Sequence, residues 1–349
     1  MTTIQTIEYN TLVHPLRTTF ATARGSKTCA TNVIVKVTCE DGSTGIGEVP
    51  TSFVVPRETP EVIEQSIRRS ERLLCDQKID QWPSLTEMLR GIFPKFHMTC
   101  SGLETAMFRS HLSSVNLDEK TWWGGKLDTV KSDITIPFVP DIEILKPWIQ
   151  RAVHEGFDIY KIKVSGNIKQ DTSFIHSITE ILSESGRLYT IRLDGNQGFT
   201  CDSALRLLDE LDEKIELFEQ PLKYNDYSGM EQLCEKAPLP IIADETVFSV
   251  QDCQRVIEYG LAHGINIKIA KSGITQTRQI IEMAKKAKLK LMIGCMTETM
   301  AGLSTAIYCA MGTGTFDYID LDSVHFLRHH EQYQNIVTDG PAYRLGEQL

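Results

Sequence analysis

Two lysines, Lys161 and Lys163, stand two residues apart in the segment YKIKVSG, which otherwise has the apolar character of a buried strand. Lysines are rarely fully buried unless an anion pairs with them. Side chains at positions i and i+2 of a strand point to the same face, so the two ammonium groups would lie side by side. An edge strand with solvated lysines is one explanation. A functional site that contains anions is the other.

Four further charged residues follow in strand-like segments. Asp194 lies in LDGNQG, Glu219 in FEQP, Asp244 in IADET and Lys268 in INIKIAK, with spacings of 25, 25 and 24 residues. Asp194 alone could be a turn residue and Asp244 alone a helix cap. Glu219 follows Leu217 and Phe218, and a buried carboxylate needs a partner. The regular spacing favours one charged group per repeating structural unit.

Three carboxylates on neighbouring strands would repel one another without a cation. Carboxylate oxygens are hard ligands that suit Mg²⁺, and Mn²⁺ fits the same set. Zn²⁺ is less suitable because no His or Cys joins the set. Lys163 precedes the carboxylates and Lys268 follows them, which predicts one amine on each face of a bound substrate. Free lysine has a pKa of ~10.4. We expect the Lys161 ammonium and the metal to lower the pKa of Lys163, which suits a general base, and Lys161 to contact a substrate anion.

The elements that would position these residues fall into two groups. Residues 1–125 combine strands in the first ~50 residues, including a hairpin at Asp41-Gly42, with helical patterns, and predict an α+β capping domain. Residues 126–349 alternate strand and helix patterns, which indicates a parallel sheet. Eight strands favour a (β/α)₈ barrel, with an open doubly wound sheet as the alternative, and the C-terminal tail may return to the cap. The candidate strands are 133–138, 160–166, 190–196, 215–220, 239–245, 265–271, 289–297 and 316–322.

Composition excludes some classes of partner. The 349-residue chain has a formal net charge of −10, which argues against nucleic acid or an anionic membrane as a partner. No apolar run approaches the ~20 residues of a membrane helix. The first residues lack the features of a signal peptide, and nine scattered cysteines fit reduced thiols. These features predict a cytoplasmic protein. No phosphate-binding glycine motif is present, which weakens a nucleotide-binding function.

Together the K-x-K pair, LDGNQG, FEQP, IADE and NIKIAKSGI resemble the enolase superfamily, in its muconate-lactonizing subgroup, over nearly the whole chain. The resemblance implies that Asp194, Glu219 and Asp244 bind Mg²⁺, which stabilises an enediolate, and that Lys163 and Lys268 exchange the α-proton from opposite faces. Such two-base exchange inverts the carbon. The subgroup also contains cycloisomerases, o-succinylbenzoate synthases and N-acylamino acid racemases, and a non-catalytic binding protein on this fold is a further alternative.

A second set of residues bears on the substrate. Asp320 and Asp322 lie two apart, so on a strand they would share a side and could bind the free ammonium of a dipeptide, as in the dipeptide epimerases of this subgroup. An acidic strand end that caps a helix is the plainer explanation. By the same resemblance, Arg24 would bind a glutamate side chain, and Thr135 would contact substrate. Cys295 and Thr297 lie two apart on the seventh predicted barrel strand, so they would share a face that could line the pocket. The predicted substrate is L-Ala-L/D-Glu, and we expect a homo-oligomer.

Overall fold

The N-terminal part of the chain is built on a long antiparallel sheet. The computed structural model describes residues 2–139, 141–329, 333 and 335–346. Strands β1 (Ile4–Thr22), β2 (Gly25–Cys39) and β3 (Thr44–Pro50) pair in that order. The predicted hairpin at Asp41-Gly42 joins β2 to β3, and Gly42 has a φ of 85°, a conformation that glycine adopts without strain.

Helices follow this sheet in the chain. They are α1 (Pro60–Leu74), the short 3₁₀ helix η1 (Ile79–Gln81), α2 (Trp82–Ile92), α3 (His97–Ser114) and α4 (Glu119–Trp123). Helix α3 lies directly on β3 because both surfaces lack side chains where they meet. A Cβ atom at Gly47 would lie 2.0 Å from the carbonyl oxygen of Gly102. This close packing makes the sheet and α3 one layered unit.

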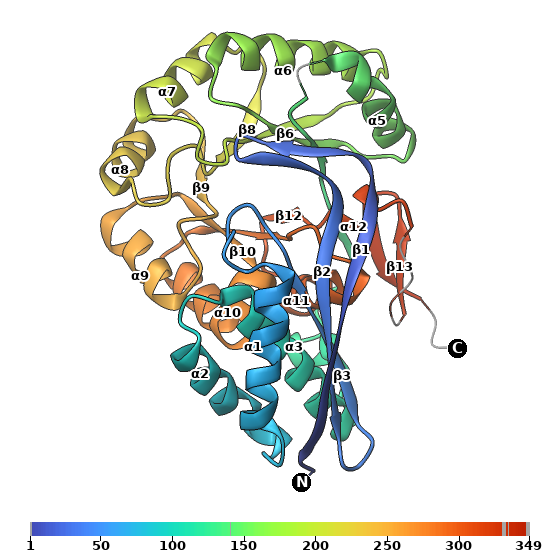
Figure 1. Ribbon diagram of the computed structural model, residues 1–349. Coiled ribbons are helices and arrows are strands. Elements are labelled where there is room, and N and C mark those ends of the chain that lie inside the picture. The colour runs from blue at the N-terminus through green and yellow to red at the C-terminus, as the bar shows by residue number, and fades with distance from the viewer. Residues whose placement is uncertain (1, 140, 330–332, 334, 347–349) are drawn as a thin grey trace.

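Eight parallel strands form the second part of the fold (Figure 1). They are β5 (Ile134–Ile136), β6 (Ile159–Lys163), β7 (Thr190–Asp194), β8 (Ile215–Glu219), β9 (Ile241–Ala243), β10 (Gly264–Lys268), β11 (Lys290–Gly294) and β12 (Tyr318–Asp320). Each strand pairs with the next in sequence. The backbone N–H of Asp133 donates to the carbonyl of Ile319 at 3.1 Å and links the two ends of the sheet. The predicted eight-stranded barrel with an N-terminal α+β domain is therefore confirmed.

Helices alternate with these strands, as the sequence predicts, and Figure 1 shows most of them on the outside of the barrel. They are α5 (Ile142–His154), α6 (Ile168–Ser183), α7 (Cys201–Glu210), α8 (Tyr227–Lys236), α9 (Val250–Tyr259), α10 (Ile269–Lys286), α11 (Met300–Thr313) and α12 (Ser323–Phe326). Because parallel strands covered on both faces are buried, the apolar strand residues form the core.

The chain after the barrel returns to earlier segments. Strand β13 (Ile336–Asp339) pairs with β14 (Ala342–Leu345), which pairs with β4 (Thr129–Lys131). Leu327 bridges Leu16 of β1, and the N–H of Arg328 donates to the carbonyl of Pro15 at 3.0 Å. The segment that follows α12 thus contacts the N-terminal sheet directly.

The tip of the β1–β2 hairpin lies over the barrel (Figure 1). The carbonyl of Ala21 accepts a hydrogen bond from the N–H of Phe138 at 3.1 Å. The Phe20 ring packs edge-on against Phe326, with 5.3 Å between ring centroids. These contacts place the hairpin tip against loops at the carboxyl ends of the strands, where barrel enzymes carry their active sites.

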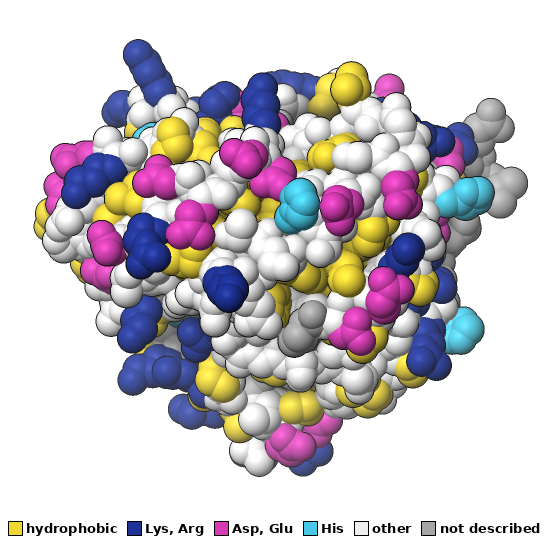
Figure 2. Space-filling view, turned by 90° about the horizontal axis from the view of Figure 1, so that it is seen from above, with side chains coloured by type: hydrophobic (Ala, Val, Ile, Leu, Met, Phe, Trp, Pro, Cys, Tyr) yellow, Lys and Arg dark blue, Asp and Glu magenta, His cyan; other side chains and the backbone are white. Residues whose placement is uncertain are grey.

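The molecular surface carries charges of both signs. On the face in Figure 2, acidic and basic side chains are interspersed, apart from a group of Lys and Arg side chains at its lower left edge. Among the described helices, none is both long and apolar enough to span a membrane. All nine cysteines lie in the described segments as free thiols.

Candidate active site

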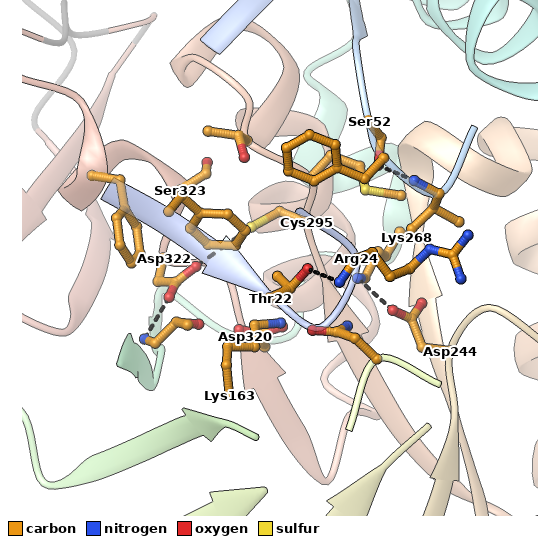
Figure 3. Close-up of a pocket in the computed structure, with 18 of the residues that line it drawn as sticks. Thr22, Arg24, Ser52, Lys163, Asp244, Lys268, Cys295, Asp320, Asp322 and Ser323 are labelled. Atoms are coloured by element: carbon orange, nitrogen blue, oxygen red, sulfur yellow. Dashed lines mark hydrogen bonds and ion pairs between the residues drawn. The ribbon is translucent and has the colours of Figure 1, made fainter. Parts of the chain in front are cut away.

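A cavity of about 80 Å³ lies between the hairpin tip and the carboxyl ends of the barrel strands. Figure 3 shows Asp322 and Ser323 on one side of it and Asp244 and Lys268 on the other. Asp194 and Glu219 are fully buried beneath it, against the lysines that line it. The structure therefore brings the predicted residues of the barrel together. The predicted residues that line the cavity are Arg24, Thr135, Lys161, Lys163, Asp244, Lys268, Cys295, Thr297, Asp320 and Asp322.

Lys161 is surrounded by carboxylates, which explains how β6 tolerates it. Its ammonium group donates to Asp320 and, at 3.2 Å, to Oε2 of Glu219, and it lies 3.9 Å from Oδ2 of Asp194. Burial disfavours the charge on Lys161, but Asp320, Glu219 and Asp194 outweigh it and raise the pKa of Lys161 well above its ordinary value. The surrounding carboxylates therefore favour the cationic form of Lys161 at the floor of the cavity.

Lys163 lies at the end of β6 and donates to Oδ2 of Asp194 at 2.5 Å. The strand register accounts for this contact, because Lys163 pairs with Asp194, and Asp194 in turn pairs with Glu219. The Lys163 ammonium also lies 5.8 Å from the centroid of the Phe20 ring, which belongs to the hairpin tip. Lys163 therefore lies between the row of carboxylates and the cap.

Lys268 ends β10 and donates to Oδ2 of Asp244 at 2.7 Å. Lys271, which the sequence analysis did not select, donates to Oδ1 and to the carbonyl of Asp244, both at 2.6 Å. Burial disfavours the Asp244 charge, but the two ammonium groups outweigh it and lower the pKa of Asp244 below its ordinary range. The signal was available, since Lys271 lies within NIKIAKSGI.

Glu219 occupies the middle of the carboxylate row. Burial and the neighbouring Asp194 raise the pKa of Glu219 to about 7. The side-chain amide of Asn266, another residue that sequence reasoning missed, donates to Oε1 of Glu219 at 2.6 Å. Asn266 lies two residues before Lys268 on β10. Residues two apart on a strand share a face, so the sequence could have placed both on the interior face of the barrel.

The donor set suits a hard divalent cation. Asp194, Glu219 and Asp244 lie at the ends of three consecutive strands and supply only oxygen atoms. Some buried oxygens nearby have no hydrogen-bond partner in the described part of the chain, namely Asn196 Oδ1, Asn266 Oδ1, Asp320 Oδ1 and both carboxylate oxygens of Glu245. Buried polar atoms without partners indicate that a ligand or ion belongs here.

A second acidic group adjoins the first. Oxygens of Asp133, Asp320 and Asp322 lie within 4.8 Å of one another, a distance that Asp194, Glu219 and Asp244 do not meet in this structure. Asp133 is paired with Arg192 at 2.7 Å, and Asp320 with Lys161. Asp133 was not predicted as a site residue, because a single Asp before an apolar strand is also typical of a turn.

The structure corrects two assumptions about strand geometry. Strand β12 ends at Asp320, and Asp322 has φ −95° and ψ 0°, so strand alternation does not relate the two carboxylates. Asp322 instead accepts a hydrogen bond from the N–H of Thr135 at 2.6 Å, which turns it into the cavity beside Asp320. Cys295 and Thr297 lie after β11, which ends at Gly294 where its pairing with β12 ends. They reach the cavity from the loop between β11 and α11 and not from the predicted strand.

The hairpin tip supplies the upper wall of the cavity. Arg24 lies in the β1–β2 turn, where its backbone N–H donates to Oγ1 of Thr22 at 3.1 Å. Lys27 also lines the cavity, and the sequence analysis missed it, because an isolated lysine near a turn is typical of a solvated surface. Apolar residues that line the cavity are Phe20 of the hairpin tip and Phe53 and Val54 of the loop after β3.

These features define a (β/α)₈-barrel protein with a capping domain and a site of lysines and carboxylates at the carboxyl ends of its strands. The family model described as "Enolase C-terminal domain-like" matches residues 145–347. The chain belongs to this family, and the predicted membership of the enolase superfamily is confirmed.

Similar proteins cover nearly the whole chain. An aromatic dipeptide epimerase of Herpetosiphon aurantiacus is 29% identical over 99% of this chain and 97% of its own. An L-Ala-D/L-Glu epimerase of Thermotoga maritima is 30% identical over 91% of each chain. A crystal structure of a dipeptide epimerase from Enterococcus faecalis, complexed with Mg and L-Leu-L-Tyr, superposes with a TM-score of 0.91 at 27% identity, covering 99% of this chain and 98% of that one.

Proposed function

We propose that the protein is an isomerase, a Mg²⁺-dependent dipeptide epimerase that inverts the α-carbon of the C-terminal residue by two-base proton transfer. The observation that carries the proposal is the position of Lys163 and Lys268. They end β6 and β10, which are four steps apart in an eight-stranded barrel and therefore on opposite sides of it. Both line the same cavity. A substrate between them presents opposite faces to the two amines.

The residues have distinct roles in this proposal. Asp194, Glu219 and Asp244 would hold the metal ion, which, when bound, supplies positive charge that stabilises an enediolate. Lys163 and Lys268 remove the α-proton from one face and return a proton to the other. Lys161, kept cationic by its carboxylate neighbours, binds the developing substrate anion. The hairpin tip covers the cavity and limits the access of water.

The substrate is assigned from the two ends of the cavity. Asp320 and Asp322 would bind the free ammonium group of a dipeptide, which N-acylated substrates lack. Arg24 at the hairpin tip would bind the carboxylate of a side chain, which favours L-Ala-L/D-Glu, as in peptidoglycan turnover. Thr135, Cys295 and Thr297 would contact the bound dipeptide. A cytoplasmic location, a homo-oligomeric state and the use of Mn²⁺ in place of Mg²⁺ remain predictions.

A library of L,L-dipeptides incubated with the Mg²⁺-loaded enzyme in D₂O tests reaction class and specificity together. Each epimerised dipeptide gains one mass unit, and we expect the largest gain with L-Ala-L-Glu. Turnover of a muconate or cyclohexadiene substrate, with no exchange in any dipeptide, would assign another reaction of this family. Metal binding without any α-proton exchange would indicate a binding protein.

A further inference from the structure

The hairpin tip presents two cations to the cavity. Arg24 and Lys27 both line it, and the other lining residues from the tip, Phe20 and Thr22, are uncharged. Lys27 of β2 pairs directly with Phe20 of β1. Directly opposed residues of antiparallel strands share a face of the sheet, so Lys27 lies on the cavity side with the Phe20 ring.

The two cations differ from the lysines of the barrel floor in lacking anionic partners. Lys161, Lys163 and Lys268 each lie within 4.0 Å of at least one carboxylate. No described carboxylate lies this close to the Lys27 ammonium or the Arg24 guanidinium, in contrast to several basic side chains elsewhere in the chain. The upper wall of the cavity therefore carries positive charge that the protein itself does not neutralise.

Lys27 is also partly removed from water. It is half-buried, and burial lowers the pKa of Lys27 to about 8. A cation that is partly removed from water and has no anionic partner is unfavourable, and an anionic ligand reduces this penalty. Glu245, a carboxylate of the cavity wall, does not supply that anion, because neither of its oxygens has a hydrogen-bond partner among the described residues.

We infer that Lys27 is a specificity-determining residue which, together with Arg24, binds an anionic side chain on the C-terminal residue of the substrate. The inference rests on the proposed dipeptide epimerase function and adds a second cation to it. Apolar Phe53 and Val54 line the same cavity and suit the methylene groups of a glutamate side chain. Two cations reject a neutral isostere, such as glutamine, more strongly than one, because both would lose their anion.

The test compares L-Ala-L-Glu with the isosteric L-Ala-L-Gln on the Mg²⁺-loaded full chain. The variants are Lys27→Met, which keeps the length of the side chain, and Lys27→Arg, which keeps the charge. Lys36→Met, on an exposed lysine of the same strand, is the matched control. Calorimetric dissociation constants and kcat/KM for α-proton exchange in D₂O are measured for each dipeptide.

We expect Lys27→Met to weaken binding of L-Ala-L-Glu by about 10-fold or more, the size of a lost hydrogen bond between charged groups. Binding of L-Ala-L-Gln should change less than about 3-fold, and KM should change more than kcat. Lys27→Arg should retain most of the preference for glutamate. The Lys36→Met control should match the wild type for both dipeptides.

Two results separate this inference from the proposed function. Equal losses for both dipeptides in Lys27→Met, or a wild type that binds them equally, would overturn the role of Lys27 while exchange still proceeds. If the wild type exchanges no dipeptide, the proposed function fails. Calorimetry then tests the role of Lys27 separately, because it measures binding without exchange. A preference for the glutamate dipeptide that depends on Lys27 would still support the anion site.

Discussion

Lys268 donates to one carboxylate oxygen of Asp244 at 2.7 Å, while Lys163, four strands away, makes the equivalent contact with Asp194 at 2.5 Å. The two proposed bases thus contact the outer members of the carboxylate row, and Glu219 lies between them with Lys161 at 3.2 Å. The lysines neutralise the carboxylates in this arrangement. The same proximity would hold both amines beside any substrate bound over the row.

Replacing either proposed base should stop inversion but not all exchange. Lys163→Ala and Lys268→Ala should each lower the epimerisation rate by about 10³-fold, within the range for loss of a general acid or base. Each variant should still exchange the α-proton of one epimer only, and the two variants should prefer opposite epimers. Proton NMR in D₂O, starting separately from the L,L and L,D dipeptides, measures this.

Lys290→Ala is a suitable control for the lysine variants, because Lys290 pairs with Asp317 at the surface. It should epimerise at the wild-type rate. Wild-type epimerisation by both Lys163→Ala and Lys268→Ala would refute the two-base assignment.

Removal of divalent metal should abolish exchange. Without a divalent cation an enediolate in the cavity loses its main stabilising charge, so chelation followed by dialysis should leave less than about one part in 10³ of the activity, if the metal's stabilisation is worth about 4 kcal/mol. Added Mg²⁺ should restore it. Asp194→Asn should weaken Mg²⁺ binding in calorimetry, which reports on the metal independently of activity. Full activity in protein shown to be metal-free by elemental analysis would contradict this role.

Asp320→Asn should mainly weaken the binding of dipeptides. Loss of one carboxylate charge from the proposed ammonium site should raise KM about 10-fold or more. Because Asp320 also contacts Lys161, the variant could lower kcat, so Asp322→Asn is the matched variant that leaves the Lys161 contact in place. An unchanged KM in both variants would show that the ammonium group binds elsewhere.

The barrel could be predicted from the sequence because alternating strand and helix patterns are visible within short segments of the chain. Strands β6, β7, β8 and β10 each end in a charged residue, and Asp244 directly follows β9. The register then brings Lys163, Asp194 and Glu219 together without further information. Strand limits were harder to predict. Cys295 and Asp322 lie beyond the last ladder hydrogen bonds, where a hydrogen bond from the N–H of Thr135, distant in the chain, holds the side-chain carboxylate of Asp322.

Other features could not be predicted because they depend on contacts between the two parts of the fold. Lys27 lines the cavity only because the hairpin tip lies over the barrel, and its position in the sequence gives no sign of this. Glu104 of α3 accepts hydrogen bonds from the N–H and hydroxyl of Thr275 at 2.8 and 2.7 Å, which ties the cap to α10. Gly273, two residues before Thr275, lies at the same contact. It has a φ of 70°, and a Cβ atom there would lie 1.8 Å from Oε2 of Glu104. A local sequence pattern cannot predict such a contact, because it joins residues that are far apart in the chain.

A buried pair of glutamates lies at another junction of the cap and the barrel. Glu48 of β3 accepts hydrogen bonds from the N–H groups of Thr299 and Gly302, both at 2.9 Å, at the start of α11. Glu298 is buried beside it and accepts from the N–H of Met296 at 3.0 Å. Burial and the nearby Glu48 raise the pKa of Glu298 to about 8. A pKa of about 8 favours the protonated form of Glu298 in the folded protein at neutral pH.

This raised pKa predicts a pH-dependent stability. The ordinary pKa of Glu298 is 4.5, so its protonated form favours the folded state fully below pH 4.5, and that contribution is lost as the pH rises through about 8. Between these values the free energy of unfolding should fall by up to about 1.4 kcal/mol per pH unit from this group. Glu298→Gln, which stays neutral, should flatten the dependence and gain stability relative to the wild type from pH 5.5 to pH 8. Urea unfolding at several pH values measures the slope, with Glu8→Gln on the exposed face of β1 as the control. Parallel slopes in the wild type and Glu298→Gln would show that Glu298 is ionised in the folded protein.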